Sequence, residues 1–89
     1  MLARHIPLLP QNLAEHRSTR GISLSQVVDA TKISVRYLQA IEWGDFGKLP
    51  GGIYGLSYVR QYARAVDCDE DLLVARYREA AKATDSGIS

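Results

Sequence analysis

The sequence predicts an all-α fold of about five helices with a helix-turn-helix near its centre. Apolar residues recur at three- and four-residue spacing, no segment alternates strictly, and β-branched clusters are few, so no strand is predicted. Glycines and helix-capping residues divide the chain into five blocks. Only residues 32 and 33 separate two of these blocks, and helices joined so tightly must cross at a steep angle.

The first two helices are predicted from their end signals. The first is expected over residues 11–20, because Gly21 follows it as a C-terminal stop. The second begins at Ser23, whose hydroxyl forms a capping-box pattern with Gln26 three residues later. Apolar positions at helical spacing form its predicted inward side: Leu24, Val27, Val28 and Thr31.

The third and fourth helices are separated by a glycine-rich loop. The third is expected to begin at Ser34, another candidate N-cap, and to end at Gly44. The fourth is expected over residues 53–66. At about 100° per residue it presents one apolar arc, which we expect to face the core: Ile53, Leu56, Val59, Ala63 and Val66.

The fifth helix completes a single domain. It is expected over residues 70–83 with Asp69 as its N-cap. Residues 1–10 are predicted to form an irregular N-terminal arm and residues 84–89 a flexible tail, which leaves residues 11–83 as the helix-turn-helix domain. Its predicted inward residues are Leu72, Leu73, Tyr77 and Ala80.

Composition places the chain among soluble, globular, cytoplasmic domains. It has 89 residues, of which 46% are hydrophobic and 24% charged, enough for one domain with a modest core. Cys68 is the only cysteine, so no internal disulfide can form. No apolar run approaches the roughly 20 residues of a membrane span. The net charge of +1 counts against a dedicated nucleic-acid binder, which usually carries a basic excess.

No pattern of residues predicts catalysis. The two histidines, His5 and His16, and the single cysteine do not supply the clustered ligands of a zinc site. The acidic residues at 67, 69, 70 and 71 complement the dipole of the fifth helix and need no catalytic explanation. We therefore predict a non-enzymatic protein with no metal, no cofactor and no small-molecule substrate.

Several short motifs in order carry a resemblance to a known family. They lie within residues 13–73 and comprise Arg20–Leu24, Thr31–Ile33, Tyr37–Glu42, Gly44–Phe46, Leu49–Gly51 and Tyr58–Arg64. This stretch resembles the N-terminal helix-turn-helix domain of the RodZ-like family, within the Xre or lambda-repressor-like superfamily. The resemblance implies a compact five-helix lambda-repressor-like bundle on the cytoplasmic face of an inner-membrane protein, anchored by a downstream segment that these residues do not include.

The resemblance also implies a partner and a structural contact. RodZ-like domains dock onto the actin-like filament protein MreB, mainly through the fourth helix and its aromatic residues. In the repressor-like fold the positions of Arg17 and Glu42 commonly pair, so we expect a salt bridge that sets the angle between two helices. Trp43 is expected to cap the following loop at the core or its rim.

The tyrosines of the fourth helix are the predicted docking residues. Tyr54, Tyr58 and Tyr62 recur every four residues, which turns each about 40° further around the helix than the last. Tyr62 lies at the edge of the predicted apolar arc, where a core position is the competing interpretation, and Tyr54 lies furthest out. Arg60 and Arg64 are expected to frame this patch and to select an acidic partner.

The alternative hypothesis is a small Xre-type DNA-binding transcriptional regulator. A helix-turn-helix reads the major groove with the N-terminal residues of its second helix. Nearby acidic residues offset the cations of that surface, and Ala40 is expected to share it, which weakens phosphate contact. The residues that would contact DNA are Lys32, Ser34, Val35, Arg36 and Gln39.

Overall fold

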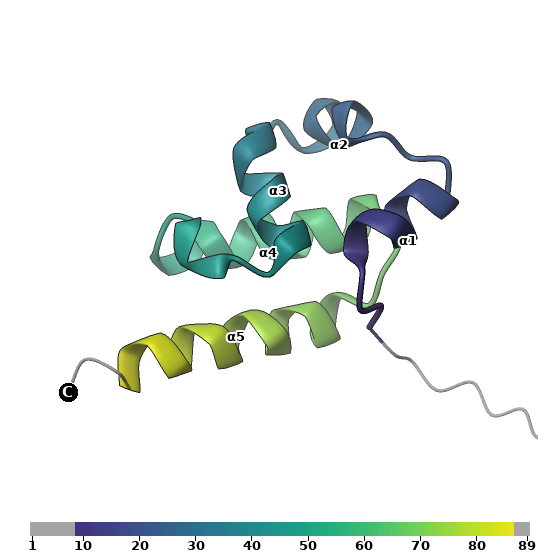
Figure 1. Ribbon diagram of the computed structural model, residues 1–89. Helices are drawn as coiled ribbons and strands as arrows, with labels where there is room; N and C mark the ends of the chain where they lie inside the picture. Colours follow the sequence, from purple (N-terminus) through teal and green to yellow (C-terminus); the bar gives the residue numbers. More distant parts are fainter. Residues whose placement is uncertain (1–8, 87–89) are drawn as a thin grey trace, which may run out of the picture.

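The computed structural model describes residues 9–86, with residues 83–86 described by their backbone only. This part of the chain contains helices and no strand, which confirms the predicted all-α class. In Figure 1, α2 and α3 lie above α4, and the long α5 runs alongside α4 on its other side. The elements are α1 (Leu13–Thr19), α2 (Leu24–Thr31), α3 (Val35–Trp43), the 3-10 turn η1 (Phe46–Lys48), α4 (Gly52–Ala65) and α5 (Glu70–Ser86).

Side-chain caps begin three of the helices. Asn12 accepts a hydrogen bond from the amide of Glu15 at the start of α1. Ser23 and Gln26 form the predicted capping box of α2, and Asp69 accepts from the amide of Leu72 in α5. These bonds satisfy backbone donors that the first turn of a helix leaves without an internal partner. Ser34 differs from its prediction, because its side chain makes no capping bond and α3 begins on backbone contacts alone.

The turn between α2 and α3 is held by one hydroxyl and one left-handed residue. Lys32 has a φ of 62°, in the left-handed region. The Thr31 hydroxyl donates to the carbonyl of Val27 and accepts from the amide of Ile33. Ile33 is then buried in the core, which fixes where α3 starts relative to α2.

The core surrounds α4, which contacts α2, α3 and α5. The buried positions of α4 and its C-cap include Val59, Tyr62 and Val66, each with no exposed surface. The predicted apolar arc was wrong at Ile53, which is 76% exposed. At about 100° per residue, Ile53 lies roughly opposite the line formed by those buried positions. The arc is rotated toward Tyr62, because the core accommodates its ring.

Gly55 allows α4 to lie close to α5 and to the loop that precedes α4. A Cβ at Gly55 would collide with the carbonyl oxygen of Pro50 and lie 2.6 Å from the hydroxyl oxygen of Tyr77. The ring of Tyr77 packs edge-on against Phe46, with centroids 5.6 Å apart. Only a residue without a side chain fits at position 55, so this glycine sets the spacing between the two helices.

The described residues are non-helical at the N-terminal end and helical at the C-terminal end. Residues 9–12, which precede α1, are not helical. Leu9 is partly buried and packs against the core. The rest of the predicted N-terminal arm, residues 1–8, lies outside the described residues. At the other end α5 continues to Ser86, so residues 84–86 extend the helix instead of belonging to a tail. Residues 87–89 again lie outside the described part.

Candidate binding surfaces

The three tyrosines of α4 lie in three different environments. Tyr54 is 63% exposed, whereas Tyr62 has no exposed surface. Tyr58 is half-buried, with its ring centroid 5.6 Å from that of Tyr37 on α3. A step of about 40° between successive tyrosines accounts for this gradient. Only Tyr54 presents most of its ring to a partner.

Tyr62 belongs to a polar contact inside the core. Its hydroxyl donates to Oε2 of Glu42, 2.9 Å away. The same carboxylate accepts from Nε of Arg17 at 2.6 Å and from Nη2 at 3.3 Å, which confirms the expected salt bridge. Burial, and then the negative charge of Glu42, raise the pKa of Tyr62. The prediction that Tyr62 contacts a partner was therefore wrong, because its ring fills the core and its hydroxyl connects α4 to α3 and α1.

The resemblance to the repressor-like fold predicted the pairing of Arg17 with Glu42, but it did not identify Tyr62 as the third member. Tyr62 could have been identified from the sequence because it places a side chain with a terminal hydroxyl at a position of the apolar arc. A tyrosine at the edge of an apolar arc needs a hydrogen-bond partner once it is buried. The buried carboxylate of Glu42 is the acceptor that this contact requires.

Arg60 and Arg64 are both bound to Glu70 at the start of α5. Nη1 of Arg60 lies 2.9 Å from one carboxylate oxygen, and Nε of Arg64 lies 2.9 Å from the other. Hydrogen bonds from Arg64, and then from Arg60, lower the pKa of Glu70. The bond to Glu70 likewise raises the pKa of Arg64. The expectation that these arginines select an acidic partner loses its basis, because an acidic group of the same chain already holds them.

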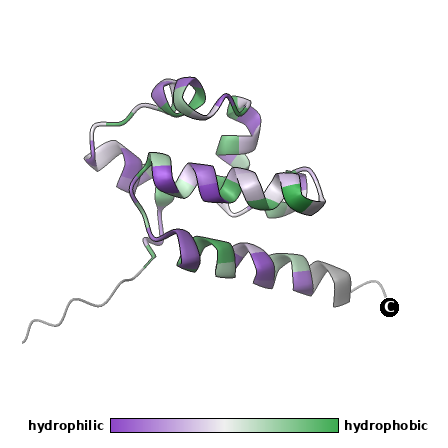
Figure 2. Cartoon of the chain, turned by 180° about the vertical axis from the view of Figure 1, so that it is seen from behind, coloured by the Kyte–Doolittle hydropathy of each residue, from purple (hydrophilic) through white to green (hydrophobic). Residues whose placement is uncertain are grey.

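The first turn of α4 carries the exposed apolar residues of this helix. Ile53 is 76% and Tyr54 63% exposed, and Ser57 on the next turn is also exposed. A shallow hollow of about 280 Å³ begins beside Ile53 and extends along α4 past Ser57 to Arg64. Figure 2 looks onto α4 and shows hydrophobic colouring at its N-terminal end. This end is an apolar surface that the core does not use.

The outer face of α3 carries the residues predicted for DNA contact. Lys32, Ser34 and Arg36 are exposed, and Val35 is 46% exposed. Two expectations for this helix were wrong. Ala40 is buried at 3% exposure, and Trp43 is 72% exposed instead of capping the loop. Trp43 is the last residue of α3 and points away from the core, because Leu38 and Ile41 already take the inward positions.

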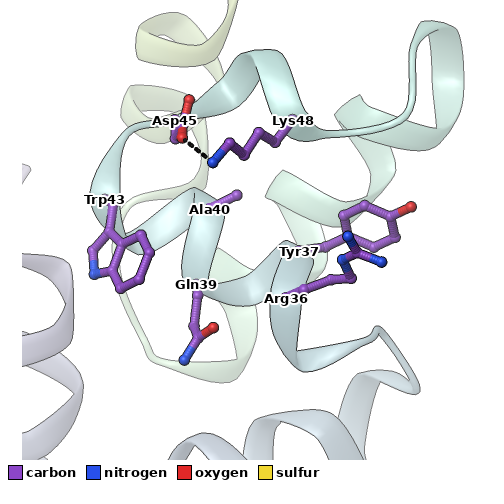
Figure 3. A pocket seen from close by; sticks show the side chains of 7 residues that line it. All are labelled: Arg36, Tyr37, Gln39, Ala40, Trp43, Asp45 and Lys48. Carbon is purple, nitrogen blue, oxygen red and sulfur yellow. Dashed lines mark ion pairs between the residues drawn. The ribbon is translucent and has the colours of Figure 1, made fainter.

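A groove of about 420 Å³ lies on this face, between α3 and the loop that follows it. Figure 3 shows Arg36 and Tyr37 on one side, Trp43 on the other and Ala40 between them. Asp45 and Lys48 of the loop form an ion pair at 3.2 Å along one edge. The groove is therefore lined by aromatic rings and charged groups rather than by a uniform basic surface.

Cys68, the only cysteine of the chain, is not activated as a nucleophile. It is half-buried, and burial, followed by the nearby carboxylates of Asp69 and Asp67, raises its pKa to about 11. The thiolate is the reactive form, so the group stays protonated near neutral pH. Within residues 9–82, no three His, Cys, Asp or Glu side chains form a group that could hold a metal ion. Among the described helices, none combines the length and hydropathy that crossing a membrane requires.

Comparison with known proteins assigns the family. The model of a helix-turn-helix domain family matches residues 12–73, from the N-cap of α1 into α5. The chain belongs to this RodZ-type helix-turn-helix family. The uncharacterized membrane protein YmfM of Bacillus subtilis (strain 168) is 40% identical over 58 residues, which cover 65% of this chain and 20% of YmfM. The cytoskeleton protein RodZ of Streptococcus pneumoniae is 34% identical over 61 residues, which cover 68% of this chain and 22% of RodZ.

These comparisons concern one domain of longer proteins. The chain spans about a fifth of the length of the curated relatives it matches. No solved structure was found to match it. The matched residues 12–73 include the Arg17–Glu42–Tyr62 contact, the first turn of α4 and the α3 groove. The family assignment therefore covers both candidate surfaces without deciding between them.

Proposed function

We propose that this domain is a non-catalytic docking module that binds an MreB-like actin filament through the first turns of α4. The observation that carries the proposal is the exposure of Ile53 and Tyr54, at 76% and 63%, on a helix whose other side forms the core. The name of one relative, cytoskeleton protein RodZ, supports a cytoskeletal partner. The name of the other, a membrane protein, supports a position at the cytoplasmic face of a membrane as part of a longer protein.

Tyr54 is the expected anchor of this surface. A tyrosine ring buries about 150–250 Å² when a partner covers it, and its hydroxyl tolerates the wet edge of an interface. At roughly 25 cal/mol per Å², removing such a ring from the interface costs a few kcal/mol. Ile53 adds an aliphatic contact beside it. Arg60 and Arg64, each paired with Glu70, form a polar rim on later turns of the same helix.

The charges on α3 favour this assignment over duplex DNA. Lys32 and Arg36 are exposed, but the carboxylates of Asp29 and Asp45 lie on the same helix-turn-helix, and Lys48 is paired with Asp45. Affinity for duplex DNA depends on several cations that neutralise phosphates. Once Lys48 is paired with Asp45, only Lys32 and Arg36 remain as cations on this surface, with the Asp29 carboxylate nearby in the sequence, and they supply little of that attraction.

Co-sedimentation with polymerised MreB tests the proposal. We expect the wild-type chain to pellet with the filament and Tyr54→Ala to bind at least about tenfold more weakly, as loss of a buried aromatic anchor predicts. Trp43→Ala is the matched control, because Trp43 is a similarly exposed aromatic on another helix. Circular dichroism would verify that both variants fold. Equal binding by Tyr54→Ala and wild type, or a loss confined to Trp43→Ala, would overturn the proposal.

A further inference from the structure

The groove on α3 is a second surface, separate from the exposed first turn of α4. Its floor is Ala40, whose small side chain is 3% exposed. Figure 3 shows Tyr37 and Trp43 on opposite sides of this floor. The Tyr37 ring is held from behind by Tyr58 of α4, at a centroid distance of 5.6 Å. The Tyr37 wall of the groove is therefore packed against α4, whereas the Trp43 wall is an indole that is 72% exposed.

The groove has a single uncompensated charge. Arg36 is exposed and makes no ion pair with any residue in the described part of the chain. Lys48 and Asp45, at the other edge, neutralise each other. A guanidinium presents its donors in a planar fork that matches a carboxylate. The chemistry complementary to this end of the groove is therefore one carboxylate group.

The remaining lining suits a peptide. An aliphatic or aromatic side chain can lie on the Ala40 floor between the two rings, where contact with aromatic surface is favourable. Gln39 lines the same groove, and its amide makes no hydrogen bond to another described residue. A primary amide both donates and accepts, so it can pair with the N–H and C=O groups of a peptide backbone.

We propose that this groove docks an acidic peptide segment, with a carboxylate side chain on Arg36 and a neighbouring apolar side chain between Tyr37 and Trp43. A peptide fits better than duplex DNA, because the one unpaired guanidinium of the groove matches a single carboxylate, whereas affinity for duplex DNA depends on several cations that neutralise phosphates. None of the residues that line the groove belongs to α4, so variants of the two surfaces can be tested separately.

Trp43 provides a direct reporter, because it is the only tryptophan in the chain. Its indole N–H gives one signal in a nitrogen–proton NMR spectrum of the isotope-labelled 89-residue chain. The probe is the synthetic peptide acetyl-Gly-Glu-Leu-Phe-Glu-Gly-amide, and the matched control replaces both Glu by Gln. We expect saturable shifts of the Trp43 indole and Gln39 amide signals, with about tenfold weaker binding of the neutral peptide.

Variants separate this proposal from the docking of a filament by α4. Arg36→Ala is expected to weaken the acidic peptide about tenfold, with Arg36→Lys between it and wild type. Tyr54→Ala should leave peptide binding unchanged, and the spectra themselves show whether each variant is folded. Three results would overturn the proposal: no shift at the highest soluble peptide concentration, equal binding of both peptides, or tighter, salt-sensitive binding of a short duplex DNA to the same residues.

Discussion

Two arginine–glutamate contacts in this domain have similar geometry and different surroundings. In the inner contact, Nε of Arg17 lies 2.6 Å from Glu42, and the side chains are 15% and 3% exposed. In the outer contact, Arg60 and Arg64 lie 2.9 Å from Glu70, and the three side chains are 37%, 66% and 24% exposed. Distance alone does not distinguish these contacts. Their exposure to water does, because water screens the outer charges more strongly than the inner ones.

The inner contact also includes more hydrogen bonds between buried groups. The Glu42 carboxylate accepts from both Arg17 and Tyr62, and Arg17 also donates to the carbonyl of Ile22. Removing Glu42 leaves the buried Tyr62 hydroxyl without its acceptor and Arg17 with the Ile22 carbonyl alone, which is more costly than the net value of the pair. The outer groups can turn to water when their partner is removed. The same residue types therefore hold the bundle together in one place and order its surface in the other.

The largest expected effect is that of Glu42→Ala. This change leaves the Arg17 guanidinium and the Tyr62 hydroxyl without their acceptor, and we expect a loss of about 3 kcal/mol in the free energy of unfolding. Urea unfolding followed by circular dichroism measures it. Glu79→Ala, at an exposed position of α5, is the control and should change stability little. A loss below about 1 kcal/mol for Glu42→Ala would mean that the inner contact behaves like a surface pair.

Tyr62→Phe isolates the hydroxyl. The ring still fills the core and Arg17 still pairs with Glu42, so only the hydrogen bond to the carboxylate is lost. We expect a decrease of about 1–2 kcal/mol, measured in the same unfolding experiment. Tyr54→Phe removes an exposed hydroxyl from the same helix and should have no measurable effect. If both substitutions gave the same result, Tyr62 would contribute through its ring alone.

Glu70→Gln is expected to have the smallest effect. It removes the charge that Arg60 and Arg64 share, and the side chains can turn to solvent. Because their hydrogen bonds lower the pKa of Glu70, its contribution is present above the unfolded pKa and is lost as the pH falls through the folded pKa. Thermal unfolding should therefore show a small difference from wild type at neutral pH that disappears in acid. A difference that grows in acid would contradict this assignment.

Salt concentration separates the two contacts further. At about 1 M salt the Debye length falls to about 3 Å, so exposed charges are largely screened. We expect the effect of Glu70→Gln to vanish and that of Glu42→Ala to remain nearly unchanged. Unfolding curves of both variants and wild type at low and high salt measure this. Equal salt sensitivity would show that water reaches the inner contact.

The helices were largely predictable because their end signals are local. The Ser23–Gln26 capping box, the Asp69 cap and the left-handed Gly44 at the end of α3 all occur as predicted. Each depends on residues within a few positions of one another. Ser34 was the exception among the caps, and α5 continued to Ser86 past its predicted end. The RodZ-type family was likewise visible in short local motifs and is confirmed.

The candidate surfaces were less predictable, because they depend on residues far apart in the chain. Periodicity placed the tyrosines at a regular spacing, but the position of Glu42 decided that Tyr62 lies inside. Likewise, Glu70 decided that two arginines of α4 are already paired. By itself, then, the sequence determined the helices, most of their ends and the family, through contacts between near neighbours. Only the tertiary structure decided which side chains remain available to a partner, because burial and ion pairing depend on which helices meet.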